Sequence, residues 1–223
     1  MQVLGDQRIK LDKEDSWAWK DKETVVFTVK SVYKVLKEVV QGVERELYGG
    51  FWRLKAQPSS QLIAWRVLED KIATKAKLVR RGLCMTTITC CLCGEEEEIT
   101  SHLFYTCRVS WLVWSKCYEW MGLAGIVHRK PKKYFESFRM SGVKESVNEI
   151  WGGVWIVVVG ELWFHRNKRI FRGGRIYHIE IFTLTQIKAW SWVLSKMHGV
   201  SFSYLDWCLE PLICMRSINV SRR

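Results

Sequence analysis

The sequence predicts a mainly α fold, in which a helical domain with an N-terminal β-hairpin is followed by a C-terminal helical hairpin. Apolar residues recur at helical spacing through most of the chain beyond residue 31, whereas alternation of polar and apolar residues is confined to the N-terminus. The composition, 48% apolar and 26% charged, excludes a disordered chain. The linker-like stretch 125–131 divides the chain into predicted regions 1–124 and 125–223.

The first elements are expected to be a hairpin and a helix. Residues 16–20 and 25–30 alternate around the polar turn 21–24, a pattern that is typical of a hairpin. Ser31 is suited to cap a helix over 32–48, which the pair Gly49-Gly50 would end.

The middle of the chain is expected to be helical on both sides of a cysteine-rich turn. Two short helices should lie within 59–81, separated at Thr74, and a longer helix should cover 101–121. We expect these helices to share one core around Trp65, Leu103 and Trp111.

Two long periodic segments follow. Residues 147–171 and 176–197 should form the C-terminal helical hairpin, with Gly173-Gly174 between them. The tail 202–214 is aromatic and non-periodic, and we expect it to pack back on the core.

Positive charge is concentrated in two blocks. The 35 basic and 23 acidic residues leave a net charge of +12, and most of the excess lies in 51–90 and 126–175. Such blocks attract polyanions by releasing counterions. We therefore expect weak, salt-dependent binding of RNA or DNA, although the blocks also suit ordinary solvated faces. The residues expected to contact phosphates are Lys71, Lys75, Lys77, Arg80 and Arg81.

Neither a membrane span nor an export signal is expected. The longest uncharged apolar stretch, 150–160, is about half of a membrane span. The first residues lack the apolar core of a signal peptide. We expect an intracellular protein with no membrane association, with nucleus and cytoplasm both open.

Six of the eight cysteines fall between Cys84 and Cys117, and four residues there have the spacing of a metal site. Cys90-x2-Cys93 lets two thiolates on one turn bind the same ion, and His102-x4-Cys107 supplies two further ligands. Three Cys and one His form a closed tetrahedral shell for structural Zn²⁺, so we expect a small Cys3His zinc knuckle. Cys91 or Cys84 can be considered as substitute ligands, and a group of buried free thiols is the alternative to a metal site.

Several short motifs surround these ligands in a fixed order. They are Phe51-Trp52-Arg53-Leu54-Lys55, Ala64-Trp65-Arg66-Val67-Leu68, Leu78-Val79-Arg80-Arg81-Gly82, Cys93-Gly94-Glu95-Glu96-Glu97 and His102-Leu103-Phe104. With them, the chain resembles the zinc-binding domain that follows the reverse transcriptase of plant non-LTR (LINE-type) retrotransposons. It departs from that family at Ile72-Ala73-Thr74, where Leu-Pro-Thr is usual, and at Cys91, where Pro is usual.

The resemblance implies an accessory module that holds template RNA or target DNA beside a reverse transcriptase domain. It does not imply an enzyme, because polymerase chemistry needs paired aspartates for two Mg²⁺ ions and no Asp lies between Asp70 and Asp206. The alternatives are a structural or protein-interaction module and an inactive retrotransposon-derived fragment.

Overall fold

The structure is a computed structural model of the 223-residue chain, and it describes residues 48–54, 56–125, 127–196 and 202–218. Contacts divide the chain into two compact units, Met1–Tyr48 and Gly49–Arg223, and the description below concerns the second unit. The predicted hairpin over 16–30 and nearly all of the predicted helix over 32–48 lie outside the described residues. The boundary predicted at 124/125 falls inside the second unit.

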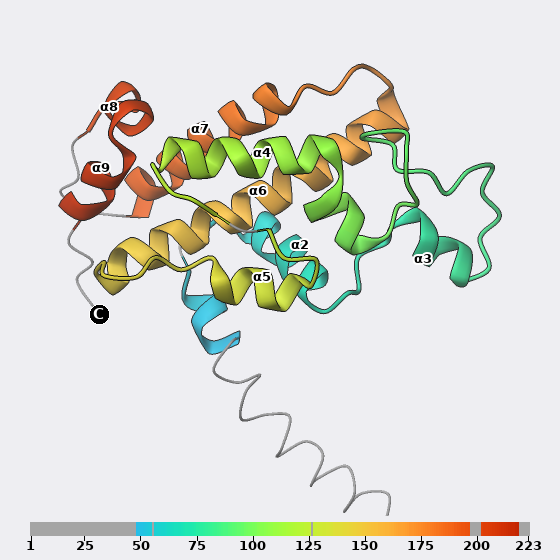
Figure 1. The fold of residues 1–223 in the computed structure, drawn as a ribbon, viewed down its shortest axis with the longest axis horizontal. Helices are drawn as coiled ribbons and strands as arrows, with labels where there is room; N and C mark the ends of the chain where they lie inside the picture. Colours follow the sequence, from blue (N-terminus) through green and yellow to red (C-terminus); the bar gives the residue numbers. More distant parts are fainter. Residues whose placement is uncertain (1–47, 55, 126, 197–201, 219–223) are drawn as a thin grey trace, which may run out of the picture. The chain divides into compact units, whose positions relative to one another are not determined.

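The second unit is built from helices, as predicted (Figure 1). Among the described residues, β pairing amounts to one isolated antiparallel bridge between Thr89 and Glu97. In chain order, the elements are α2 (Pro58–Leu68), α3 (Lys75–Arg80), the π-helical turn η1 (His102–Thr106), α4 (Arg108–Trp120), α5 (Pro131–Ser137), α6 (Glu145–Arg172), α7 (His178–Lys196), α8 (Tyr204–Leu209) and α9 (Pro211–Ser217).

Helix α6 is the centre of the unit and contacts α2, α7 and α9 (Figure 1). It is long and apolar enough to cross a membrane, but 83% of its most apolar window is buried by the protein itself. Core packing therefore accounts for its hydrophobicity. Gly160 lets α2 lie close, because a Cβ at this position would come within 2.5 Å of Ser60 Oγ.

The C-terminal helical hairpin is confirmed. Helices α6 and α7 make the most extensive contact between any two elements of the described chain. Gly173 and Gly174, both at positive φ, separate them. Positive φ suits glycine because it has no Cβ.

Trp114 of α4 lies in an aromatic core that the sequence located only partly. Its indole donates to Phe104 O at 2.7 Å, and its ring packs against Tyr134 and Phe138. The last two belong to α5 and its end, a seven-residue helix that was not predicted, since a helix this short shows too little of the helical period.

The prediction that Trp111 belongs to the core is wrong, because its side chain is 51% exposed. The helix predicted over 101–121 is interrupted at Cys107, where ψ is 133°, and the interruption changes which residues of α4 face inward. Leu103 is fully buried as predicted, whereas Trp65 is only half-buried.

The tail forms two short helices, which were not predicted from its non-periodic sequence. Ser203 and Asp206 form a capping box at the start of α8, and Pro211 begins α9. Trp207 of α8 is buried and donates its indole N–H to Gln186 O, so the tail does pack back on the core.

Candidate metal centre

Two cysteines lie on one tight turn. Gly94 N–H donates to Cys90 O at 2.8 Å, and Cys90 N–H donates to Glu96 O at 2.7 Å, which closes the loop around Cys93. Gly94 has a φ of 76°, a conformation that costs about 1–2 kcal/mol for a residue with a Cβ. The turn therefore depends on glycine directly after the second cysteine.

His102 and Cys107 are brought together by the π-helical turn η1. Residues five apart in a regular α-helix point about 140° away from each other. Here Cys107 N–H donates to His102 O at 2.8 Å, an i→i+5 bond that places the two residues on the same side. Cys107 then takes an extended ψ, and α4 begins after it.

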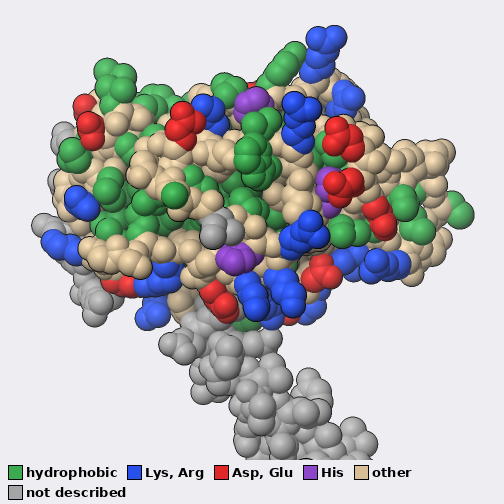
Figure 2. Space-filling view, in the orientation of Figure 1, with side chains coloured by type: hydrophobic (Ala, Val, Ile, Leu, Met, Phe, Trp, Pro, Cys, Tyr) green, Lys and Arg blue, Asp and Glu red, His purple; other side chains and the backbone are tan. Residues whose placement is uncertain are grey.

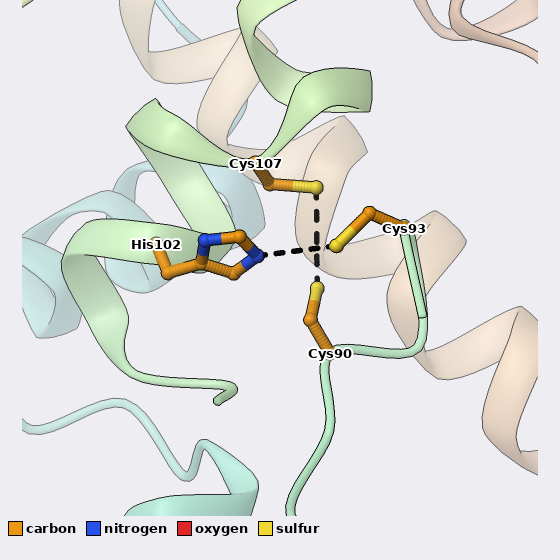
Figure 3. Close-up of side chains that lie close together, drawn as sticks. All are labelled: Cys90, Cys93, His102 and Cys107. Atoms are coloured by element: carbon orange, nitrogen blue, oxygen red, sulfur yellow. Dashed lines mark hydrogen bonds between the residues drawn. The ribbon is translucent and has the colours of Figure 1, made fainter. Parts of the chain in front are cut away.

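The four side chains converge on one point (Figure 3). All four candidate ligand atoms lie within 4.8 Å of one another. The sulfurs of Cys90 and Cys107 are 3.9 Å apart, and Cys93 Sγ is 3.3 Å from His102 Nε2. Tetrahedral zinc with ordinary bond lengths separates two sulfurs by about 3.8 Å and a sulfur from a nitrogen by about 3.6 Å. The donor set therefore fits Zn²⁺ in both chemistry and dimensions.

Comparison with known families agrees with this geometry. Residues 27–114 match the family described as zinc-binding in reverse transcriptase, and the four converging residues lie inside the match. This segment is a reverse transcriptase zinc-binding domain. Its cofactor is zinc. No curated protein and no solved structure matches the chain.

The histidine of the zinc-binding domain is held in a fixed orientation. His102 Nε2 faces Cys93, while Nδ1 lies 3.1 Å from Glu96 Oε2 and 3.4 Å from Thr106 Oγ1. A proton on Nδ1 that is donated to the carboxylate leaves the Nε2 lone pair free for a metal. Glu96 is therefore a partner of the metal site and not simply a charge in a solvated loop.

The thiols of Cys90 and Cys107 are hydrogen-bonded to each other, with their sulfurs 3.9 Å apart. The hydrogen bond from Cys90 to Cys107 raises the pKa of the Cys90 thiol well above its usual range, and burial raises it further. The same bond lowers the pKa of Cys107.

The two substitute ligands considered from the sequence lie outside this group. Cys91 Sγ contacts Arg166 O at 3.8 Å, and burial raises the pKa of Cys91 to about 12. Cys84 is exposed. Among the described residues, the group that can hold a metal consists of Cys90, Cys93, His102 and Cys107.

Glu98, which lies between Cys93 and His102, anchors the zinc-binding domain to helix α6. Its side chain is fully buried, and Oε1 accepts from Arg166 Nη2 at 2.6 Å and from Nε at 3.1 Å. Oε1 also accepts the Lys75 backbone N–H at 2.9 Å, at the start of α3. Glu98 is therefore buried although it ends a run of four glutamates, and Arg166 is a core residue and not a free surface charge.

The predicted phosphate contacts differ in how accessible they are. Lys71, Arg80 and Arg81 are exposed. Lys77 Nζ pairs with Asp70 at 2.6 Å. Lys75 is buried and its ammonium donates to Thr89 O at 2.8 Å, so the structure does not place it to contact a phosphate. The contacts of Lys75 with Thr89 O and of Lys77 with Asp70 explain this difference, and charge alone does not reveal it.

Proposed function

We propose that the chain is a nucleic-acid-binding accessory module of a reverse transcriptase, with Zn²⁺ held by Cys90, Cys93, His102 and Cys107. When bound, the ion would have a purely structural role, because it would cross-link the turn that carries Cys90 and Cys93 to η1 and Cys107. Three thiolates and one imidazole complete a tetrahedral shell and leave no position for a reacting water. The zinc-binding domain is accessory to catalysis, and we extend this non-catalytic role to the whole chain.

The nucleic-acid part of the proposal rests on exposed arginines that are not buried in the core of the fold. Arg80 and Arg81 are exposed at the end of α3. Arg172 and Arg175 are exposed at and just beyond the end of α6. These side chains are available after the buried Lys75 and Arg166 and the paired Lys77 are set aside. Figure 2 shows Lys and Arg interspersed with Asp and Glu around hydrophobic side chains on one face.

The salt dependence of binding tests this proposal. Affinity of the zinc-loaded chain for a single-stranded RNA should fall linearly on a log–log plot, with a slope of roughly −0.7 for each phosphate engaged. Changing Arg81, Arg172 and Arg175 together to Gln should flatten the slope by roughly 2. Arg216→Gln, on α9 at the opposite end of the unit from α3 in Figure 1, should leave the slope nearly unchanged.

A slope near zero, or no binding at low salt, would reject the nucleic-acid function. The second candidate is a docking module for a reverse transcriptase domain, and exposed aromatic side chains favour it. Trp111, Phe164 and Phe171 are all more than half exposed. Such surfaces are typical of protein contacts when they form a contiguous patch. Salt-independent association with a polymerase domain would favour this candidate.

A further inference from the structure

A cavity of about 290 Å³ lies beside the zinc-binding knuckle. Its walls come from three segments: the turn before α3 together with α3 itself, the stretch that precedes His102, and the approach to α5. This volume is close to the lower end of the range for small-molecule sites, roughly 300–1,000 Å³. The cavity can therefore hold a group the size of a phosphate with an attached sugar.

The walls carry an excess of positive charge. Lys77 and Arg80 come from α3, and Arg129 and Lys130 come from the segment before α5. Asp70 is the acidic wall residue, and it pairs with Lys77. Three of the four cations thus remain unopposed within the wall, and they come from segments about fifty residues apart. An anion is the ligand that this charge favours.

Two buried hydroxyls at the cavity wall have no hydrogen-bond partner among the described residues. They are Thr74 Oγ1 and Thr100 Oγ1, on side chains that are 0% and 4% exposed. A buried hydroxyl without a partner costs free energy, so it points to a polar ligand that accepts or donates there.

The hydroxyl of Thr74 is free for a specific reason. Thr74 is the N-cap residue of α3, but its side chain makes no capping bond. Glu98 takes this role, because its carboxylate accepts the Lys75 N–H at 2.9 Å and its carbonyl accepts the Ala76 N–H at 3.4 Å. The usual acceptor at a helix start is thereby left without a partner, on a residue that lines the positively charged cavity.

We propose that this cavity is a phosphate-binding site. Arg80, Arg129 and Lys130 neutralise the phosphate, and the hydroxyls of Thr74 and Thr100 donate to its oxygens. In the proposed function, the phosphate belongs to a nucleic-acid strand, and only that identification of the source rests on the proposed function. The stretch that lines the cavity runs directly into His102, so the site adjoins the zinc ligands.

The direct test is titration of the full-length, zinc-loaded chain with inorganic phosphate at constant ionic strength, followed by calorimetry and by amide chemical shifts. We expect saturable binding with shifts at Thr74, Thr100 and Ser101, and none with chloride. Thr74→Val and Thr100→Val keep the side-chain shape and remove hydroxyls that have no partner in the fold. Each should weaken phosphate binding roughly tenfold without loss of stability.

Two neighbouring arginines provide a matched pair. Arg80 lines the cavity and Arg81 does not, although both are exposed and carry the same charge. Arg80→Gln should weaken phosphate binding several-fold, whereas Arg81→Gln should leave it nearly unchanged. Asp70→Asn should strengthen binding, because it removes the opposing carboxylate, and Asn tolerates the φ of 51° at this position.

Absence of saturable phosphate binding, or equal effects of the two arginine variants, would overturn the proposal. A single-stranded RNA arm separates this failure from failure of the proposed function. If inorganic phosphate fails to bind while RNA binding keeps its salt slope and ignores Thr74→Val and Thr100→Val, the phosphate site falls and the proposed function stands. If inorganic phosphate binds as expected and RNA does not, the phosphate site stands and the nucleic-acid function falls.

Discussion

Glu98 and Arg166 form a buried ion pair that joins the zinc-binding domain to the central helix α6. The carboxylate oxygen Oε1 lies 2.6 Å from Arg166 Nη2, although 68 residues separate the two in sequence. The side chain of Glu98 is 0% exposed and that of Arg166 is 5% exposed. The guanidinium of Arg166 also stacks on Trp163, with its Cζ 4.7 Å from the centroid of the ring. The knuckle is therefore tied to a helix that lies outside the matched family segment.

Breaking this pair should strongly destabilise the chain. Arg166→Met leaves a buried carboxylate without its partner, which typically costs about 3–5 kcal/mol. Arg172→Met removes an exposed charge from the end of the same helix and should change stability by less than about 0.5 kcal/mol. Urea unfolding of the zinc-loaded proteins measures both. Equal, small losses in the two variants would show that the pair does not anchor the knuckle.

Zinc content distinguishes the ligand cysteine from its neighbour. Cys107→Ser should lower bound zinc from one ion per chain to well below one, because the tetrahedral set loses a thiolate. Cys91→Ser should keep the full content, since Cys91 Sγ contacts Arg166 O and not the ligand group. Elemental analysis of purified protein gives both values. Retention of zinc by the Cys107 variant would contradict the assignment.

Glu96 should tune zinc affinity through His102. Loss of a carboxylate that orients a metal-binding histidine typically costs about 10–100-fold in affinity. Glu96→Gln should therefore weaken zinc binding by that factor, as measured by competition with a chelator. Glu95→Gln removes an exposed charge from the same run and should have little effect. If both variants weaken binding alike, the effect is one of general charge and not of histidine orientation.

The two neighbouring tryptophans of α4 should differ sharply in their contribution to stability. Trp114→Ala removes a fully buried indole from the aromatic core and should cost about 3–5 kcal/mol. Trp111→Ala removes a half-exposed ring and should cost about 0.5 kcal/mol or less. Denaturant unfolding at matched zinc loading compares them. A larger loss of stability in Trp111→Ala than in Trp114→Ala would contradict the exposure of Trp111 and support the core predicted from the sequence.

Cysteine alkylation should follow exposure and pKa. At pH 8, Cys84 should react first because it is exposed. Cys91 should react slowly, since burial raises its pKa to about 12 and little of it is thiolate. As the pH is raised towards that pKa, the alkylation rate of Cys91 should increase about tenfold per pH unit, because the thiolate is the reacting species. Mass spectrometry of labelled peptides follows each site, and fast labelling of Cys91 at pH 8 would contradict its burial.

The spacing of Cys90, Cys93, His102 and Cys107 was sufficient to predict that these four side chains converge, because each pair lies close in sequence and local turns bring its members together. The paired long helices were also predictable, since their apolar residues repeat over many turns and Gly173-Gly174 separates them. In each case the determining interactions are local, or belong to a long periodic face.

The tertiary structure decided what local patterns do not specify. Regular helical spacing places Trp111 and Trp114 on one face, but the irregular turn at Cys107 leaves only Trp114 buried and Trp111 half exposed. Glu98 and Arg166 read as surface charges in sequence, yet they pair in the core because folding brings the knuckle against α6. Whether Lys75, Lys77 and Thr74 are paired or unpaired likewise depends on which other residues the fold brings next to them. The identity of the three residues does not determine this.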